Sequence, residues 1–216
     1  MQPRHPILAA TLDVAMRPMY AARKLVVPEA RGRVLEIGVG TGLNFDLYGE
    51  AVSALVGIEP DPYMLRRARR RAQHVPQAIE LHEVGAEELP FAAASFDTVV
   101  VTFTLCTIPE PEAALGEMRR VLRPEGRLLF LEHVRSPGSV MARLQDVVTP
   151  VWRRLFGGCH PNRNAADLVR AAGFAIDEMA PIGRERWNPL PVARGIARPL
   201  AASRRVSSPE PAPGER

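Results

Sequence analysis

Three observations predict an α/β fold with a doubly wound, mostly parallel sheet for this chain of 216 residues. Short apolar runs with strand character alternate with helical patterns, which is typical of βαβ units. A glycine-rich turn follows the first apolar run, in "VLEIGVGTGLNF" (34–45), where sheets of this class bind ligands. The composition, with 46% apolar and 24% charged residues, is sufficient for a packed domain.

The chain divides into three parts. Residues 1–30 are predicted to form an amphipathic helical cover, because apolar side chains recur at helical spacing over 7–23, with a kink at Pro18. Residues 31–198 are predicted to form the main domain. Residues 199–216 are rich in Pro, Ser and Arg, and we expect a disordered tail there, since too little apolar surface offsets the cost of ordering it.

The elements of the main domain follow from periodicity and from turn residues. The predicted strands are 34–37, 54–58, 79–84, 96–103, 127–132 and 174–179. The predicted helices are 43–48, 62–73, 110–122 and 165–172. A further helical pattern covers 140–156, where we expect Pro150 to bend the helix. A turn is expected at 124–126, just before the fifth strand.

Charge and cysteine content exclude several classes of protein. The net charge of +4 is scattered and aromatic residues make up only 6%, so no nucleic-acid partner is predicted. Two cysteines cannot form a disulfide framework or a zinc site of the usual four-ligand kind, and no metal is predicted. A reducing, cytoplasmic location is expected, because neither a secretory signal nor an apolar run of 18 residues is present.

The glycine-rich turn predicts a nucleoside-containing ligand. Gly38, Gly40 and Gly42 allow a tight turn and the close approach of a ligand. A dinucleotide fingerprint would place its third glycine at Leu43, and a phosphate-binding P-loop would need a lysine after the turn, so neither pattern fits. What fits is acid-x-G-x-G-x-G beginning at Glu36, with a second acid, Glu59, closing the second strand.

This arrangement resembles the class I S-adenosylmethionine-dependent methyltransferases. The resemblance implies that the glycine loop passes the methionyl part of the cofactor and that Glu36 helps to hold its amino end. It also implies that Glu59 accepts hydrogen bonds from both ribose hydroxyls, for which a carboxylate with two acceptor oxygens is suited. The fold that it implies is a Rossmann-like, seven-stranded, mostly parallel sheet with helices on both faces.

The resemblance covers about residues 30–180. In "VGAEELPFAAASFDTVV" it assigns the adenine ring to Gly85, Ala86 and Glu87, and "FDTVVVTFTLCTIPEP" resembles the fourth strand with its exit. The cofactor is therefore expected to be S-adenosylmethionine. The predicted cofactor-binding residues are Glu36, Gly38, Gly40, Gly42, Asn44, Glu59, Pro60, Met64, Gly85, Ala86, Glu87, Thr104 and Leu105.

Candidates for the acceptor side follow the fourth and fifth strands. His133 is suited to act as a general base near neutral pH, or it only packs beside the sheet. Cys106 is an inert buried thiol or part of the wall that touches the substrate. His160 lines the mouth of the site or is satisfied by water, and Trp152 belongs to an apolar region that either covers the cleft or packs in the core.

A finer resemblance comes from "TLCTIPEP", "LFLEHV" and "LFGGCHPNR" together. These segments look like the alkyl-thiol methyltransferase branch and like bacterial phospholipid and ubiquinone-type methyltransferases. In the alkyl-thiol methyltransferase branch an acid of the adenine-side motif matters for activity. The resemblance therefore implies a catalytic role for Glu87, in addition to that of His133.

The predicted function is in-line methyl transfer to a small-molecule acceptor, with a thiol first. The alternatives are N-methylation of a phospholipid amine and C-methylation of a quinone precursor. A non-enzymatic alternative is an inactive cofactor-binding module that acts through its arginine-rich tail. Peripheral contact with a membrane is allowed, and no oligomeric state is predicted.

Overall fold

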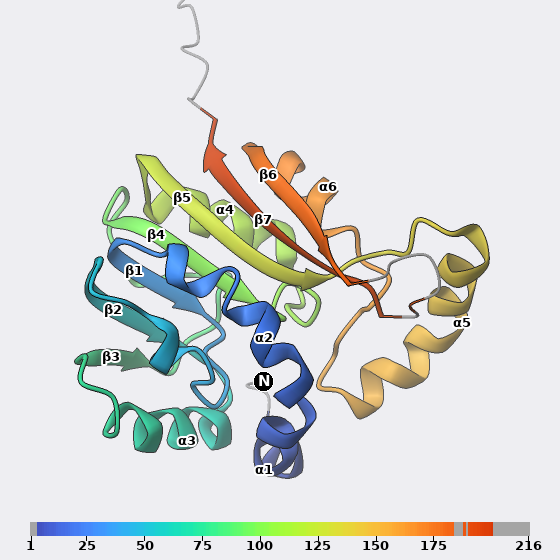
Figure 1. Cartoon of the computed structure of the whole chain (residues 1–216), viewed down its shortest axis with the longest axis horizontal. Helices are drawn as coiled ribbons and strands as arrows, with labels where there is room; N and C mark the ends of the chain where they lie inside the picture. The colour runs from blue at the N-terminus through green and yellow to red at the C-terminus, as the bar shows by residue number, and fades with distance from the viewer. Residues whose placement is uncertain (1–3, 184–187, 189, 201–216) are drawn as a thin grey trace, which may run out of the picture.

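A computed structural model describes residues 4–183, 188 and 190–200 of the chain, so the predicted tail beyond 200 lies outside the described residues. Within them, one sheet has seven strands in the order β3-β2-β1-β4-β5-β7-β6 (Figure 1). The strands are β1 (Gly32–Ile37), β2 (Val52–Ile58), β3 (Ile79–His82), β4 (Phe96–Thr102), β5 (Leu122–His133), β6 (Phe174–Ile182) and β7 (Val192–Pro199).

The sheet is doubly wound and mostly parallel, which confirms the predicted fold class. Strands β1 to β5 pair in parallel, and only β7 is antiparallel to its neighbours β5 and β6. The chain winds outward from β1 to β3 on one side and from β4 onward on the other. The carboxyl ends of β1 and β4 therefore form the switch point, where ligands of such sheets bind.

Helices cover both faces of this sheet. Their bounds are α1 (Pro6–Ala15), α2 (Tyr20–Arg23), α3 (Pro62–Ala72), α4 (Pro111–Val121), α5 (Ser139–Leu155) and α6 (Ala165–Ala171). Short 3₁₀ turns cover Arg17–Met19, Val27–Glu29 and Phe45–Leu47. Helix α4 packs on one face with α6, whereas buried residues of α2 and α3 belong to the core on the other face.

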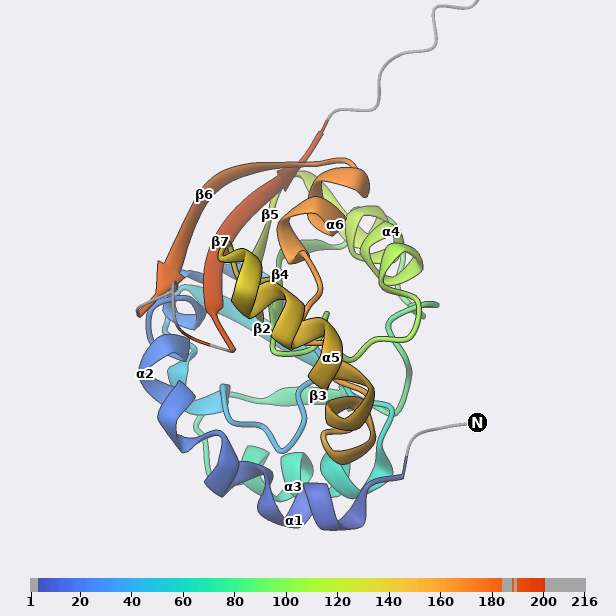
Figure 2. The ribbon, with the colours of Figure 1, turned by 90° about the vertical axis from the view of Figure 1, so that its right-hand side faces the viewer.

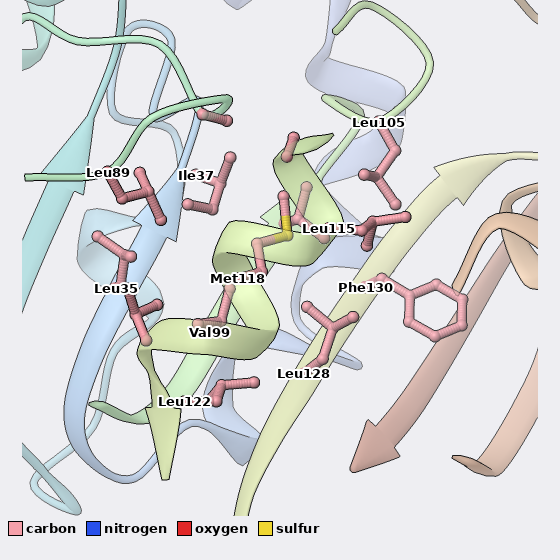
Figure 3. Close-up of a cluster of buried hydrophobic side chains, with 14 of the residues drawn as sticks. Leu35, Ile37, Leu89, Val99, Leu105, Leu115, Met118, Leu122, Leu128 and Phe130 are labelled. Carbon is pink, nitrogen blue, oxygen red and sulfur yellow. The ribbon is translucent and has the colours of Figure 1, made fainter. Parts of the chain in front are cut away.

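The larger core cluster lies between α4 and the centre of the sheet (Figure 3). Leu115 and Met118 of α4 are fully buried and point toward β1, β4 and β5 in this view. The apolar residues of α4 recur at helical spacing, and burying each large side chain contributes about 1.5–3 kcal/mol. This packing fixes the strands whose carboxyl ends carry the candidate site.

Two helices lie beyond the carboxyl ends of the parallel strands. Helix α1 and helix α5 both lie on the side to which these strands point, away from the two faces of the sheet (Figures 1 and 2). Pro18 lies in the 3₁₀ turn between α1 and α2, at the predicted kink. Helix α5 continues past Pro150 to Leu155, so this proline does not end the helix. Among the described residues, no helix is both long and apolar enough to cross a bilayer.

The structure differs from the predicted elements at three places. Strand β7 was not predicted, because "VARGIARP" is short, contains Gly195 and two arginines, and gains its strand partners only from distant segments. Strand β5 begins at Leu122, so the turn expected at 124–126 is an irregular part of the strand, where pairing with β4 shifts register. The helix expected at 43–48 is reduced to the 3₁₀ turn Phe45–Leu47.

Candidate active site

The glycine-rich turn adopts a backbone that only glycine takes without strain. Gly38, Gly40 and Gly42 have φ angles of +66°, +56° and +83°, all in the left-handed region. A Cβ atom on Gly38 would lie 2.5 Å from the Thr104 side chain, but one on Gly40 would meet only Leu12, at 3.5 Å. The turn is therefore packed against β4 at Gly38 and left approachable at Gly40, which suits a ligand that passes close to the backbone.

Glu59 lies at the end of β2 with its carboxylate directed at this turn. It accepts hydrogen bonds from the backbone N–H of Gly40 at 2.9 Å and of Asp61 at 2.9 Å. The side chain is buried, and desolvation raises its pKa to about 7 despite these two donors. A buried carboxylate whose oxygens retain free lone pairs is suited to accept hydrogen bonds from a vicinal diol.

Glu36 at the end of β1 lies inside a buried polar network. Its carboxylate accepts hydrogen bonds from Asn44 Nδ2 at 2.8 Å and Tyr48 Oη at 2.9 Å. Burial is the main cause that raises its pKa to about 7. The Asn44 amide also accepts a bond from the Arg23 guanidinium at 2.8 Å and donates to Thr102. Glu36 and Asn44 therefore support the turn from inside the protein. Their predicted contact with a cofactor stays a prediction.

Helix α1 is fastened across the glycine-rich turn. Asp13 accepts a hydrogen bond from the Thr41 hydroxyl and pairs with Arg71 at 2.8 Å and Arg67 at 3.2 Å. Arg71 also donates to the Thr41 carbonyl at 2.8 Å. These bonds join α1, the turn and α3, and the role of the N-terminal segment as a cover stays a prediction.

The predicted adenine-side residues follow β3. Ala86 is buried, Gly85 and Glu87 are half-buried, and the Glu87 carboxylate lies so close to Gly85 that a Cβ there would be 2.7 Å from Oε2. Pro60 and Met64, beyond β2, are half-buried. The Glu59 N–H donates to the His82 carbonyl at 3.1 Å, which joins the ends of β2 and β3. Asp61 Oδ1 caps α3 by accepting from the N–H groups of Tyr63 at 2.8 Å and Met64 at 3.4 Å.

The exit of β4 is held by a buried acid at the end of β5. Glu132 is fully buried and accepts bonds from the backbone N–H groups of Thr104 at 2.7 Å, Leu105 at 2.9 Å and Cys106 at 3.3 Å. Desolvation raises its pKa to about 7. Phe103, just before this loop, has a φ of +56°, which is rare for an aromatic residue and typical of strained functional loops.

Two acceptor-side candidates, Cys106 and His133, meet at this loop together with Cys159, which was not predicted. The sulfur of Cys106 lies 3.9 Å from Nδ1 of His133, and the same nitrogen lies 3.9 Å from the sulfur of Cys159. The two sulfurs are 3.4 Å apart. The hydrogen bond between the two sulfurs is the largest cause that lowers the pKa of Cys159 and raises that of Cys106.

The remaining predicted acceptor residues are His160, in the loop after α5, and Trp152, in α5 itself. His160 donates its backbone N–H to the Cys106 carbonyl at 2.7 Å, and burial is the main cause that lowers its side-chain pKa. Trp152 of α5 stacks on Phe156 with ring centroids 4.0 Å apart. The indole Nε1 of Trp152 is buried and has no hydrogen-bond partner among the described residues.

Several residues of this region were missed by sequence reasoning. Arg23, Asp13, Glu132 and Cys159 each act through partners that are distant in the sequence, such as Arg23 and Thr102 at 2.8 Å. The one signal for Cys159 in the sequence was the glycine pair Gly157 and Gly158 just before it. In the structure these glycines have φ angles of +59° and +90°, and the chain turns back there toward the β4 exit. An acid flanked by apolar residues in "LFLEHV" was the signal for Glu132.

Together, the switch-point turn with its flanking carboxylates defines an α/β protein that binds a nucleoside-containing cofactor. Comparisons with known proteins make this class specific. Residues 35–130 match a family described as a methyltransferase domain. In addition, a solved S-adenosylmethionine-dependent methyltransferase of Thermotoga maritima, described as a possible histamine N-methyltransferase, shares the fold with a TM-score of 0.67. It is 22% identical, and the match covers 89% of this chain and 98% of that one.

Two curated relatives give the same result from sequence. The human thiol S-methyltransferase TMT1B is 38% identical over 69% of this chain and 64% of its own length. A phosphatidylethanolamine N-methyltransferase of Cereibacter sphaeroides is 42% identical over 51% of this chain and 56% of its own length. The chain thus spans less than two thirds of these relatives. In sequence and in fold it is similar to methyltransferases, among them the S-adenosylmethionine-dependent enzyme of Thermotoga maritima.

Proposed function

We propose that this chain transfers the methyl group of S-adenosylmethionine to a small, largely apolar acceptor, with a thiol as the leading candidate. The observation that carries the cofactor part is the Glu59 carboxylate, which is buried and bonded to Gly40 of the glycine-rich turn at 2.9 Å. A carboxylate in this position supports a hydrogen-bonded ribose, and the approachable side of Gly40 suits the methionyl part of the cofactor.

The sulfonium cofactor supplies an activated methyl group, and the chain's contribution is to hold an acceptor in line with it and to exclude water. Glu132 fixes the β4 exit through three backbone N–H groups, so the wall on the acceptor side is preorganised. His133 is proposed to take the proton of an acceptor that arrives as a thiol. Glu87 is proposed to contribute to catalysis from the adenine side of the cofactor site.

A thiol acceptor is supported by the similarity to thiol S-methyltransferases, which extends over 69–73% of this chain. The proposed acceptor region also contains apolar side chains. Cys106 and Leu105 are buried there, and at the end of α5 the rings of Trp152 and Phe156 stack on each other. Such a lining favours a small apolar molecule over a charged one.

A phospholipid amine is the second candidate, and the surface of α5 favours it. This helix exposes a row of large apolar side chains and carries Arg143 in its first half and Arg153 and Arg154 in its last turn, a pattern of helices that lie on anionic membranes. The exposed apolar residues are Val140, Leu144, Val147, Val148, Val151 and Leu155. On this reading, α5 brings the chain into peripheral contact with the membrane that carries the acceptor.

Transfer of labelled methyl groups distinguishes the candidates. The full chain is incubated with labelled S-adenosylmethionine and, in separate reactions, with a small aromatic thiol, a quinol, and vesicles of phosphatidylethanolamine with and without anionic lipid. We expect label in the thiol. Label found only in the phospholipid would replace the thiol by the second candidate, and cofactor binding without transfer to any acceptor would favour a binding module.

A Val147→Asp, Val151→Asp double variant separates membrane contact from chemistry. Both side chains are exposed, so the charges should leave folding intact. We expect unchanged transfer to a soluble thiol. A selective loss of vesicle methylation would support the phospholipid candidate.

A further inference from the structure

Two cysteines and a histidine from three separate segments meet beside the proposed acceptor region. Cys106 comes from the β4 exit, His133 from the end of β5, and Cys159 from the loop after α5. One ligand atom from each lies within 4.8 Å of the other two. The proposed methyl transfer requires at most the base function of His133, so it leaves the convergence of the two thiols unexplained.

The separations match those of a metal ion's ligands. In a tetrahedral zinc site with Zn–S bonds of about 2.3 Å and Zn–N bonds of about 2.0–2.1 Å, two sulfurs lie about 3.8 Å apart and a sulfur and a nitrogen about 3.6 Å apart. The corresponding distances here are 3.4 Å between the sulfurs and 3.9 Å from each sulfur to Nδ1 of His133. Small side-chain movements would therefore bring all three atoms to bonding distance of one ion.

The surrounding backbone holds these ligands in place, and the two cysteines are not joined by a disulfide. The loop that carries Cys159 is fastened to the β4 exit by the His160 N–H on the Cys106 carbonyl at 2.7 Å. Arg163 adds two bonds of 2.7 Å, to the carbonyls of Leu105 and Ile108. A preorganised site loses little conformational entropy on binding, which is the usual requirement of a tight metal site.

Charge and solvation also favour a thiophilic divalent ion. Cys106 and Cys159 are 2% and 6% exposed, so two thiolates in this place without a cation would be poorly solvated. A divalent ion with two thiolates and a neutral imidazole has no net charge, and the buried complex avoids the desolvation cost of a separate charge. Two thiolates and an imidazole are ligands preferred by zinc and by related soft transition metals.

We propose that Cys106, His133 and Cys159 form a three-ligand site for a thiophilic transition-metal ion, with Zn²⁺ as its representative. Nδ1 is the ligating nitrogen of His133, which places the ring proton on Nε2. Two protons leave with the thiols as the ion binds. Three protein ligands leave the fourth position open, as in catalytic zinc sites.

The open position gives the site a chemical use that rests on the proposed function. With the ion bound, His133 would be a ligand and no longer the base, and a thiol acceptor at the open position would lose its proton to solvent and be held as a thiolate, the nucleophilic form. The metal site itself does not depend on this step. Its presence is measured without any methyl transfer, so failure of the site and failure of the proposed function are separate results.

Cobalt titration tests the site directly. The full chain, reduced with a phosphine and freed of metal, is titrated with Co²⁺ and then with Zn²⁺. We expect thiolate-to-cobalt charge-transfer absorption that saturates at about one ion per chain and disappears when Zn²⁺ displaces cobalt. In parallel, Zn²⁺ should protect both cysteines of the unaltered chain from alkylation, a readout that needs no variant.

Variants assign the ligands. Cys159→Ser and His133→Ala should each weaken Zn²⁺ binding by more than about 100-fold, beyond the effect of losing an outer-shell partner. His82→Asn, which removes a surface histidine paired with Glu80, should bind as the parent does. Circular dichroism confirms that each variant is folded. Absence of the charge-transfer band in the folded parent chain, or a Cys106–Cys159 disulfide that forms in air and excludes Co²⁺, would overturn the proposal.

Discussion

The two halves of the carboxyl edge are built in different ways. The cofactor half, defined here as the turn 38–42, Glu59 and 85–87, comes from segments that each follow their own strand and carry a recognisable local pattern. The acceptor half, defined as 103–108, His133 and 157–163, is assembled from segments up to 58 residues apart, as in the bond from Arg163 to Leu105. Local backbone chemistry defines the first half, and tertiary contacts define the second.

This difference has a functional meaning for the fold. The turn and its carboxylates serve the cofactor on the proposed function, whereas the relatives are named for different acceptors, a thiol and phosphatidylethanolamine. Acceptor specificity can change most easily where the residues of the site are positioned by covering segments and by long-range hydrogen bonds. The following predictions test whether the two halves can be perturbed separately.

The largest expected effect on stability comes from Glu132→Ala in the acceptor half. The substitution leaves the backbone N–H groups of Thr104, Leu105 and Cys106 buried without their acceptor, and we expect a loss of about 3–5 kcal/mol in the free energy of unfolding. Chemical denaturation measures it.

Glu132→Gln is the matched control for this change. The amide oxygen of the glutamine can replace Oε1, which accepts the bonds from Thr104 and Leu105. The variant therefore loses only the bond from the Cys106 N–H to Oε2. We expect a clearly smaller loss than for alanine. Equal stability of the two variants would show that these bonds do not hold the β4 exit.

In the cofactor half, Gly38→Ala should weaken cofactor binding by about 10-fold or more. The residue has a φ of +66°, and its new Cβ would lie 2.5 Å from Thr104, so the turn must move. Gly49→Ala is the control, because a Cβ there meets nothing within 4 Å. Equal affinities of the two variants, measured by calorimetry, would contradict a rigid turn.

The buried acids predict a pH dependence of stability. Burial raises the pKa of Glu36 and of Glu59 to about 7, whereas both are near their ordinary value in the unfolded chain. Between about pH 5 and 7 the folded chain therefore binds more protons than the unfolded chain, and its stability should fall as the pH rises through this window.

Denaturation at several pH values measures this slope. Glu59→Gln should reduce the slope, and Glu83→Gln, at an exposed position, should leave it unchanged. A stability that stays flat or rises from pH 5 to 7 in the parent chain would show that these carboxylates are ionised at little cost.

The smallest effect is expected away from both halves. Gly116 lies inside α4, and a Cβ there would meet nothing within 4 Å. Gly116→Ala should stabilise the chain by about 0.5–1 kcal/mol, because alanine loses less backbone freedom in a helix. Thermal unfolding should show a small upward shift, with cofactor affinity unchanged. A change in affinity would mean that the core under the switch point is coupled to the turn.

The sequence was sufficient for most of the fold, because helical and strand periods are local. The α4 pattern of Leu115 and Met118 predicted its buried face, and the apolar run of β4 predicted a central strand. Strand β7 escaped prediction, since its pairing with β5 and β6 is a tertiary property. Gly195 within it lies where a Cβ would be 2.1 Å from the Phe130 ring, a constraint visible only in the packed sheet.

The candidate site divides in the same way. The glycines of the turn and Glu59 carried a pattern with known spacing, and the structure brings Glu59 to Gly40. Cys106 and His133 were recognised one by one, but their meeting with Cys159 depends on how the loop after α5 folds back. Arg23 has no local signal, because its buried partners Asn44 and Thr102 lie 21 and 79 residues away.

The central claim is that Glu59 grips the ribose of the cofactor beside the glycine-rich turn. Calorimetric titration of the full chain with S-adenosylhomocysteine, the demethylated product, tests it most directly. We predict binding at one site and a loss of about 100-fold for Glu59→Ala, equivalent to about 2.7 kcal/mol, with Glu83→Ala binding as the parent does. No binding by the parent chain, or an unchanged affinity of Glu59→Ala, would contradict the account.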